Sequence, residues 1–82
     1  ALAIVDYSKA IGLKPDDTEI YLNRGRVHER QGDYAAAIAD YSKAIGLNPL
    51  YARAYYRRGG AYTNHGNHTA AIMDYSKFIE LN

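Results

Sequence analysis

The sequence contains no cysteine, no tryptophan, one phenylalanine and two prolines. The absence of Cys excludes disulfides, thiolate zinc sites and Cys nucleophiles from this chain. An excess of one charge is also missing, because the formal net charge is only +1. This balance does not favour nucleic acid or an acidic surface as a partner. No apolar run approaches the roughly 18 residues of a transmembrane helix, and no signal-peptide pattern opens the chain.

The sequence does contain enough apolar residues for the core of one small domain. Of its 82 residues, 48% are apolar and 23% are charged, a composition typical of a folded domain. Thirteen Ala and nine Tyr stand against sixteen Leu, Ile, Val and Phe together. We therefore expect a thin core in which small residues let the elements approach closely and Tyr rings fill the gaps. The first residue is not Met, from which we expect a fragment or a processed product.

An internal repeat of 34 residues organises the chain. The string DYSKAIGL occurs at residues 6–13 and again at 40–47, and DYSKFIEL follows at 74–81. Residues 6–39 and 40–73, aligned position by position, share 16 identities in 34 that are spread along the whole unit. Self-similarity at this period is the signature of a repeat architecture.

Each unit has the pattern of two helices. Between residues 34 and 46, apolar residues recur at steps of three and four, which indicates one helical face. The pairs Gly32-Asp33 and Gly66-Asn67 are typical of a helix end followed by a helix cap. We predict five helices, near residues 1–13, 18–30, 34–46, 52–64 and 68–81.

Other local signals refine the helix ends. Pro15 and Pro49 end the second helix of each unit, because Pro cannot donate a backbone hydrogen bond. Asp16, with Glu19 three residues later, has the form of a capping box for the helix near 18–30. The equivalent place before residue 52 holds Leu50 and Tyr51, so we expect that helix start to be less well capped.

The residues that recur in the units have a known pattern of aromatic and small side chains. They are Tyr21, Gly25, His28, Ala37, Tyr41, Ala44 and Pro49 in one unit, Tyr55, Gly59, Tyr62, Ala71 and Tyr75 in the next, and Ala3, Tyr7, Ala10 and Pro15 ahead of both. This pattern resembles the tetratricopeptide repeat. The resemblance implies an all-α fold of antiparallel helix-turn-helix repeats in a right-handed α-solenoid. It implies a single domain over 1–82, with 1–17 as the second helix of a preceding repeat and full repeats at 18–51 and 52–82.

Three departures from the family pattern carry expectations of their own. Arg24 and Arg58 stand where the family prefers Leu, and we expect their stems to cover apolar surface while the head groups stay in water. His28 replaces a packing Tyr and is expected to be a partly buried polar side chain rather than a ligand. Phe78 replaces a small Ala, which indicates that the last helix packs differently or lies near an end.

The resemblance also implies a concave groove, lined by the first helix of each repeat, that binds a peptide. All six Arg residues fall within 18–30 or 52–64 and exceed the Glu residues there by four. Our leading hypothesis is a non-catalytic protein-interaction module that presents an Arg-rich groove to a peptide, with an acidic or C-terminal segment favoured. The candidate peptide-binding residues are Asn23, Arg26, Arg30, Arg53, Tyr56, Arg57 and Asn64.

Three of these residues match a sharper arrangement within the family. Members that bind acidic C-termini use a two-carboxylate clamp, and Asn23, Arg53 and Arg57 match three of its five positions. The other two positions belong to a helix upstream of this chain. Arg53 and Arg57 are four apart on one helical face, so both could bind one anion. The alternative that all three are ordinary polar surface groups stays open.

The remaining polar patterns favour no chemistry. His65 and His68 flank a Gly-Asn turn and are expected to be solvated, and Ser8, Ser42 and Ser76 occupy one structural position without bases. The pairs of Asp and Lys three apart, Asp6 with Lys9, Asp40 with Lys43 and Asp74 with Lys77, are interpreted as a solvated face. We therefore expect no enzyme activity, metal, cofactor, nucleic acid or membrane partner.

A second hypothesis concerns the two ends of the repeat array. Repeat units bury their apolar faces only against neighbours, so exposed end helices favour association. The chain would then be a structural scaffold, or a self-assembling homo-oligomer that associates or exchanges helices through its ends. The residues expected to matter are Ile4 and Tyr7 at one end and Tyr75 and Phe78 at the other.

Overall fold

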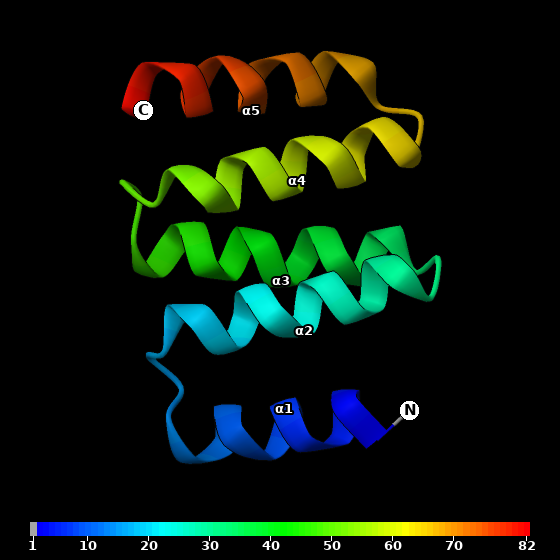
Figure 1. Cartoon of the computed structure of the whole chain (residues 1–82), viewed down its shortest axis with the longest axis vertical. Helices are drawn as coiled ribbons and strands as arrows, with labels where there is room; N and C mark the ends of the chain where they lie inside the picture. The colour runs from blue at the N-terminus through cyan, green and yellow to red at the C-terminus, as the bar shows by residue number, and fades with distance from the viewer. Residues whose placement is uncertain (1) are drawn as a thin grey trace.

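A computed structural model describes residues 2–82 of the chain, which form five α-helices. Consecutive helices run antiparallel and stack along the longest axis of a body of 32 × 25 × 14 Å (Figure 1). The predicted helix bounds are confirmed to within one residue, with residue 1 lying outside the described part. The helices are α1 (Leu2–Leu13), α2 (Thr18–Arg30), α3 (Tyr34–Leu47), α4 (Ala52–Asn64) and α5 (His68–Leu81).

The turns that join α2 to α3 and α4 to α5 are built alike. Gly32 and Gly66 have positive φ angles of 79° and 86°, a conformation that Gly adopts without steric cost. The side chain of Asp33 then accepts a hydrogen bond from the backbone N–H of Ala36, and Asn67 accepts one from Ala70. Both predicted caps are confirmed. These local signals place the start of each second helix.

The start of α2 differs from the predicted capping box. The cap is Asp17, whose carboxylate accepts from the backbone N–H of Glu19, so the expectation for Asp16 was wrong. Glu19 does not complete a box, because its carboxylate accepts a hydrogen bond from the hydroxyl of Tyr51. The start of α4 has no side-chain cap at Tyr51, as the sequence predicted.

The core consists mainly of Ala and Tyr, which confirms the thin core expected from composition. Small Ala side chains allow close helix packing, and the rings fill the space between them. Tyr41 is fully buried at the centre, while its equivalents near the two ends, Tyr7 and Tyr75, are only partly buried. The buried apolar side chains are Tyr21, Leu22, Ala37, Tyr41, Ala44, Ala54, Tyr55, Ala61 and Ala71.

Arg24 forms a link across three helices that the sequence did not predict, while its side chain stays 24% exposed. Its guanidinium on α2 binds the buried carboxylate of Asp40 on α3 at 2.7 and 2.8 Å. It also donates to the hydroxyl of Ser8 on α1 at 3.2 Å. Asp40 raises the pKa of Arg24 through these hydrogen bonds, against the opposing effect of burial. Arg24, which stands where the family prefers Leu, therefore joins its repeat to the helix before it.

The same link recurs 34 residues later. Arg58 on α4 binds Asp74 on α5 at 2.7 Å through two nitrogens and donates to Ser42 on α3 at 3.1 Å. Its guanidinium also lies 5.9 and 5.7 Å from the ring centres of Tyr55 and Tyr62. We call each such set of Ser, Arg and Asp from three consecutive helices an inter-repeat link.

The inter-repeat links also correct the predicted pairs of Asp and Lys. Asp40 and Asp74 are buried rather than solvated, and each pairs with Arg instead of the Lys three residues on. Lys77 lies 3.3 Å from Glu80. Asp6, at the equivalent position of α1, is exposed as expected. A pairing between helices therefore replaces the local one in two of the three cases.

The first helices of the two repeats lie on a common face. Besides packing on its neighbours in the stack, α2 also contacts α4. Side chains that point away from the α3 core on these two helices therefore share one surface. None of the helices within residues 2–82 is long and apolar enough to cross a membrane.

Candidate functional site

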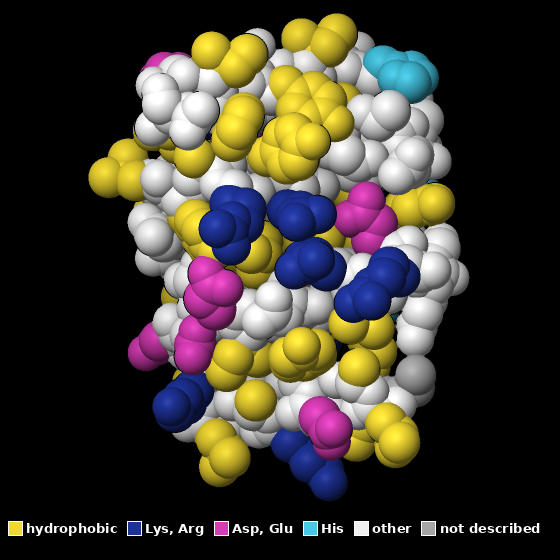
Figure 2. Space-filling model, in the orientation of Figure 1, with side chains coloured by type: hydrophobic (Ala, Val, Ile, Leu, Met, Phe, Trp, Pro, Cys, Tyr) yellow, Lys and Arg dark blue, Asp and Glu magenta, His cyan; other side chains and the backbone are white. Residues whose placement is uncertain are grey.

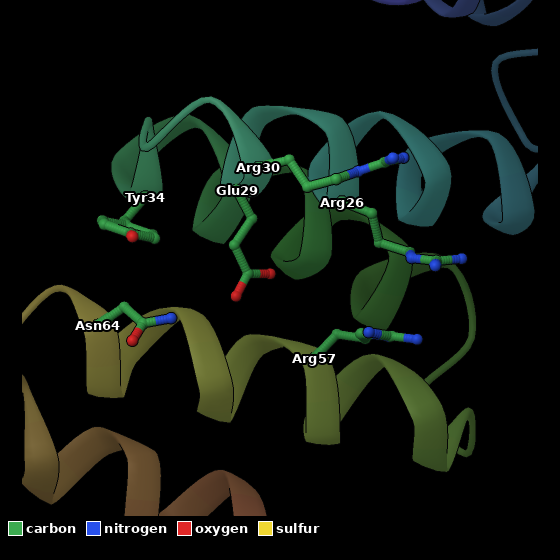
Figure 3. A pocket seen from close by; sticks show the side chains of 6 residues that line it. All are labelled: Arg26, Glu29, Arg30, Tyr34, Arg57 and Asn64. Atoms are coloured by element: carbon green, nitrogen blue, oxygen red, sulfur yellow. The ribbon is translucent and has the colours of Figure 1, made fainter.

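The surface shared by α2 and α4 carries a group of basic side chains around a hollow of about 400 Å³. Figure 2 shows these basic side chains in the middle of the face, over α2 and α4, with hydrophobic side chains beside them. We call this the basic hollow. Figure 3 shows Arg26 and Arg57 extending in the same direction from the facing helices. The lining residues are Arg26, Glu29, Arg30, Tyr34, Arg57 and Asn64.

One carboxylate lies among these guanidinium groups. Glu29 points from α2 toward α4 (Figure 3), and its Oε1 accepts a hydrogen bond of 2.8 Å from the hydroxyl of Tyr41. Burial, followed by this hydrogen bond, raises the pKa of Tyr41. The buried Tyr41 therefore holds the carboxylate of Glu29 in place. The hollow stays net positive, because three Arg residues face a single Glu.

A second hollow of about 500 Å³ lies between the start of α4 and the end of α5. We call it the aromatic hollow. Tyr56 and Phe78 form an aromatic pair in it, with ring centres 5.1 Å apart and planes tilted by 47°. Its lining residues are Tyr51, Ala52, Arg53, Tyr56, Arg57, Phe78 and Asn82.

Arg57 is common to both hollows. It also lines a third, smaller one of about 190 Å³ together with Glu29, Tyr56, Gly60 and Tyr75. Its Nε is buried without a hydrogen-bond partner among the described residues. A buried donor left without a partner carries a desolvation cost, and such groups call for an explanation. Arg57 is therefore the central residue of this surface.

The Arg residues of α2 and α4 fall into two classes. Arg24 and Arg58 are held by Asp40 and Asp74 in the inter-repeat links. The sequence had predicted that both would contribute free charge to the groove, and they do not. Within residues 2–82, the other four have no carboxylate within ion-pair distance. They are Arg26, Arg30, Arg53 and Arg57.

The structure places six of the seven predicted peptide-binding residues in the lining of the two hollows. Arg26, Arg30 and Asn64 line the basic hollow, Arg53 and Tyr56 line the aromatic hollow, and Arg57 lines both. Asn23 is partly buried on α2 and lines neither, so it does not lie in one hollow with the two Arg residues of the clamp pattern.

Sequence reasoning did not place several lining residues in the site. Glu29 entered it only as a charge, although its place three residues after Arg26 puts both on the same face of the helix. Phe78 was interpreted as a packing departure, and the change from the equivalent Ala44 was the available signal. The lining residues missed are Glu29, Tyr34, Tyr51, Ala52, Phe78 and Asn82.

The three His residues lie as the sequence predicted. His65 and His68 are exposed beside the turn between α4 and α5, and His28 is partly buried at 3.7 Å from Asp40. The part of the chain that the structure describes has no group of three or more His, Cys, Asp or Glu arranged to hold a metal ion.

Comparison with protein families assigns the chain. A model described as "Tetratricopeptide repeat" matches residues 22–79, and one described as "TPR repeat" matches residues 1–32. The chain therefore belongs to the tetratricopeptide repeat family, whose members are generally non-enzymatic interaction modules. This confirms the all-α repeat fold and the interpretation of the chain as a non-enzyme.

Solved structures with the same fold include two at about the same level of identity. The first tetratricopeptide repeat domain of Spaghetti (RPAP3), bound to the HSP90 peptide SRMEEVD, is 32% identical with a TM-score of 0.93. The match covers 96% of this chain and 63% of that one. The MamA protein is 31% identical with a TM-score of 0.90, over 95% of this chain and 43% of that one.

A further MamA structure, AMB-1, shows the likeness of fold alone, with 23% identity and a TM-score of 0.94. It matches 99% of this chain and 48% of its own. The chain therefore spans about two fifths to two thirds of the length of these structures. No curated protein matches the chain.

Proposed function

We propose that the chain is a protein-interaction module whose α2 and α4 bind an acidic peptide segment. The observation that carries the proposal is the group of four Arg residues, Arg57 among them, that have no carboxylate at ion-pair distance in residues 2–82. Arg forms short, charge-assisted hydrogen bonds with carboxylates in a fork geometry. A peptide carboxylate would supply the partner that Arg24 and Arg58 already have in Asp40 and Asp74.

The relative bound to SRMEEVD supports this assignment, because that peptide contains three acidic residues. Arg53 and Arg57 together line the aromatic hollow and are the two members of the clamp pattern that bind the terminal carboxylate in our proposal. Asn23 is the third member by resemblance. A few charge-assisted hydrogen bonds of about 1.5–3 kcal/mol each, set against association costs of at least about 4 kcal/mol, imply micromolar affinity at best.

The test is a binding titration with SRMEEVD and its C-terminally amidated twin. We expect Arg57→Ala to weaken binding of the free-carboxylate peptide about tenfold or more, the loss of one charge-assisted contact. Lys43→Ala removes an exposed charge on α3, outside the hollows, and should leave binding unchanged. Equal affinity of Arg57→Ala and the unmodified chain would sink the proposal. Asn23→Ala decides whether the third clamp residue takes part.

We propose in addition that the units of the module are residues 18–51 and 52–82, with residues 1–17 as the second helix of a preceding unit. The inter-repeat links support this division, because Arg24 donates to Ser8 on α1 as Arg58 donates to Ser42 on α3.

Self-association through the end helices is a second candidate, favoured by the outer face of α5. Ile72, Met73 and Ile79 are 65%, 69% and 72% exposed. The equivalents of the two Ile residues, Ile38 and Ile45 on α3, pack against the core. Tyr75 and Phe78, which the sequence placed at this end, are instead partly buried.

Light scattering over a hundredfold concentration range tests this candidate. We expect oligomers whose population rises with concentration and which Ile72→Glu or Ile79→Glu abolishes without changing peptide affinity. Thr69→Glu, on an exposed position of the same helix, is the matched control. A monomer at all concentrations would exclude this function.

A further inference from the structure

The second repeat differs from the first at a position that is small and buried in the first. Phe78 occupies the position that Ala10 holds in α1 and Ala44 holds in α3. Ala44 is fully buried, so the position faces the inside of the stack in the first repeat. Phe78 is only partly buried, and its ring lies against Tyr56 on α4. An Ala-to-Phe change at a core position would ordinarily overpack the core.

The ring of Phe78 forms one wall of the aromatic hollow. Tyr56 lies between Phe78 and Tyr75, at 5.1 and 5.8 Å from their ring centres, yet is still 49% exposed. A half-exposed ring at the centre of an aromatic cluster leaves apolar surface in contact with water. The hollow beside it, about 500 Å³, lies within the size range of ligand sites in proteins.

The rim of the same hollow is cationic. Arg53 and Arg57 stand one helical turn apart on α4, on either side of Tyr56 in the sequence. Figure 2 shows hydrophobic side chains over α4 and α5 directly beside the basic group over α4 and α2. An occupant must therefore combine an apolar part that reaches the rings with a negative charge that stays at the rim.

We infer that the aromatic hollow is a specificity subsite for an aromatic side chain of the acidic peptide, at the residue just before its C-terminal residue. The inference rests on the proposed function. Aromatic rings pack edge-to-face on one another, and a guanidinium can lie over a ring at the same time. The neighbouring carboxylates of the peptide then bind Arg53 and Arg57, so one short segment satisfies both halves of the hollow.

The test compares two free-carboxylate peptides, Glu-Glu-Phe-Asp and Glu-Glu-Ala-Asp, by titration against the full chain. We expect the Phe peptide to bind about tenfold more tightly, the preference that burial of one aromatic ring produces. Phe78→Ala should bring the preference to within about twofold, because the ring that the peptide Phe packs against is removed. This variant carries the residue found in α1 and α3, and circular dichroism verifies that it folds.

Two controls separate this inference from the proposed function. Ile79→Ala alters the same helix at an exposed position outside the hollow and should keep the preference for Phe. Arg57→Ala should weaken both peptides alike. Binding of both peptides by the unmodified chain without preference, or a preference that survives Phe78→Ala, overturns the subsite and leaves the acidic groove intact. Absence of binding by either peptide overturns both.

Discussion

At Gly25 and Gly59 the backbone of the first helix of each repeat touches a tyrosine ring of the second helix. A Cβ added at Gly25 would lie 2.6 Å from Cε1 of Tyr41, and one at Gly59 would lie 2.9 Å from Cε1 of Tyr75. Cβ atoms in proteins do not approach other atoms so closely. Gly is therefore required at these helix positions for packing, even though it is a poor helix former.

This contact leads to a paired prediction for Gly-to-Ala changes. Gly25→Ala should destabilise the fold by about 1–3 kcal/mol, because Tyr41 is fully buried and has little room to move. Gly46→Ala, in α3 with nothing within 4 Å of the added Cβ, should be neutral or gain up to about 1 kcal/mol from reduced backbone entropy. Denaturant unfolding measures both. Equal effects of the two changes would contradict the close contact.

Tyr41 also makes stability depend on pH at the alkaline end. Its pKa is raised in the folded chain by burial and by its hydrogen bond to Glu29. The protonated form therefore stabilises the fold fully below the unfolded pKa near 10, and this contribution falls as the pH rises above it. The loss amounts to about 1.4 kcal/mol per pH unit between the unfolded and folded pKa values.

Unfolding in urea at pH 8 and pH 11 tests this dependence. We expect the unmodified chain to lose more stability between the two pH values than Tyr41→Phe, which has no hydroxyl to ionise at this position. The comparison is internal to each protein, so the hydrogen bond lost in the variant at pH 8 does not affect it. Equal losses in the two proteins would show that Tyr41 does not titrate in this way.

At the scale of the helix, local signals allowed most of the fold to be predicted. Caps, Gly turns and Pro residues act within a few positions of themselves, and they placed every helix bound to within one residue. The shift of the α2 cap from Asp16 to Asp17 is the size of error that such signals leave.

Pairings between helices could not be predicted in the same way. Asp40 has Lys43 three residues away on its own helix, and only the packing of α2 against α3 shows that Arg24 binds it instead. The candidate site divides likewise. The Arg positions followed from the repeat pattern, whereas the wall formed by Phe78 depends on the approach of α5 to Tyr56.

The inter-repeat link provides a prediction at this scale. Asp40→Asn should destabilise the fold by about 2 kcal/mol, because it removes the buried charge that pairs with the partly buried guanidinium of Arg24. Asp6→Asn makes the same change at the equivalent but exposed position of α1 and should stay within about 0.5 kcal/mol. Thermal melts of the two variants give the comparison. A cost for Asp6→Asn as large as that for Asp40→Asn would contradict the assignment.

For the molecule as a whole, burial is uneven along the stack of helices. Helix α1 has no buried residue, while α3, packed between α2 and α4, has four. In a repeat protein each element is stabilised chiefly by its neighbours, so the end helices open more easily than the middle ones.

Amide hydrogen exchange measures this gradient directly. We expect the amides of α1 to exchange at least about tenfold faster than those of α3, which corresponds to a difference in opening free energy of about 1.4 kcal/mol. Helix α5, with two buried residues, should fall between them. Uniform protection along the chain would show that it opens only as one unit.

The spacing of the inter-repeat links restricts how such a chain can change in length. Arg24 and Arg58 each reach 16 residues back to a Ser and 16 residues forward to an Asp. A duplication or deletion of a whole 34-residue unit restores every one of these partners. An insertion of any other length within a helix puts an Asp out of register with its Arg and leaves a charge buried without its counterion. Within the helices, gains and losses of sequence are therefore tolerated only as complete units of 34 residues.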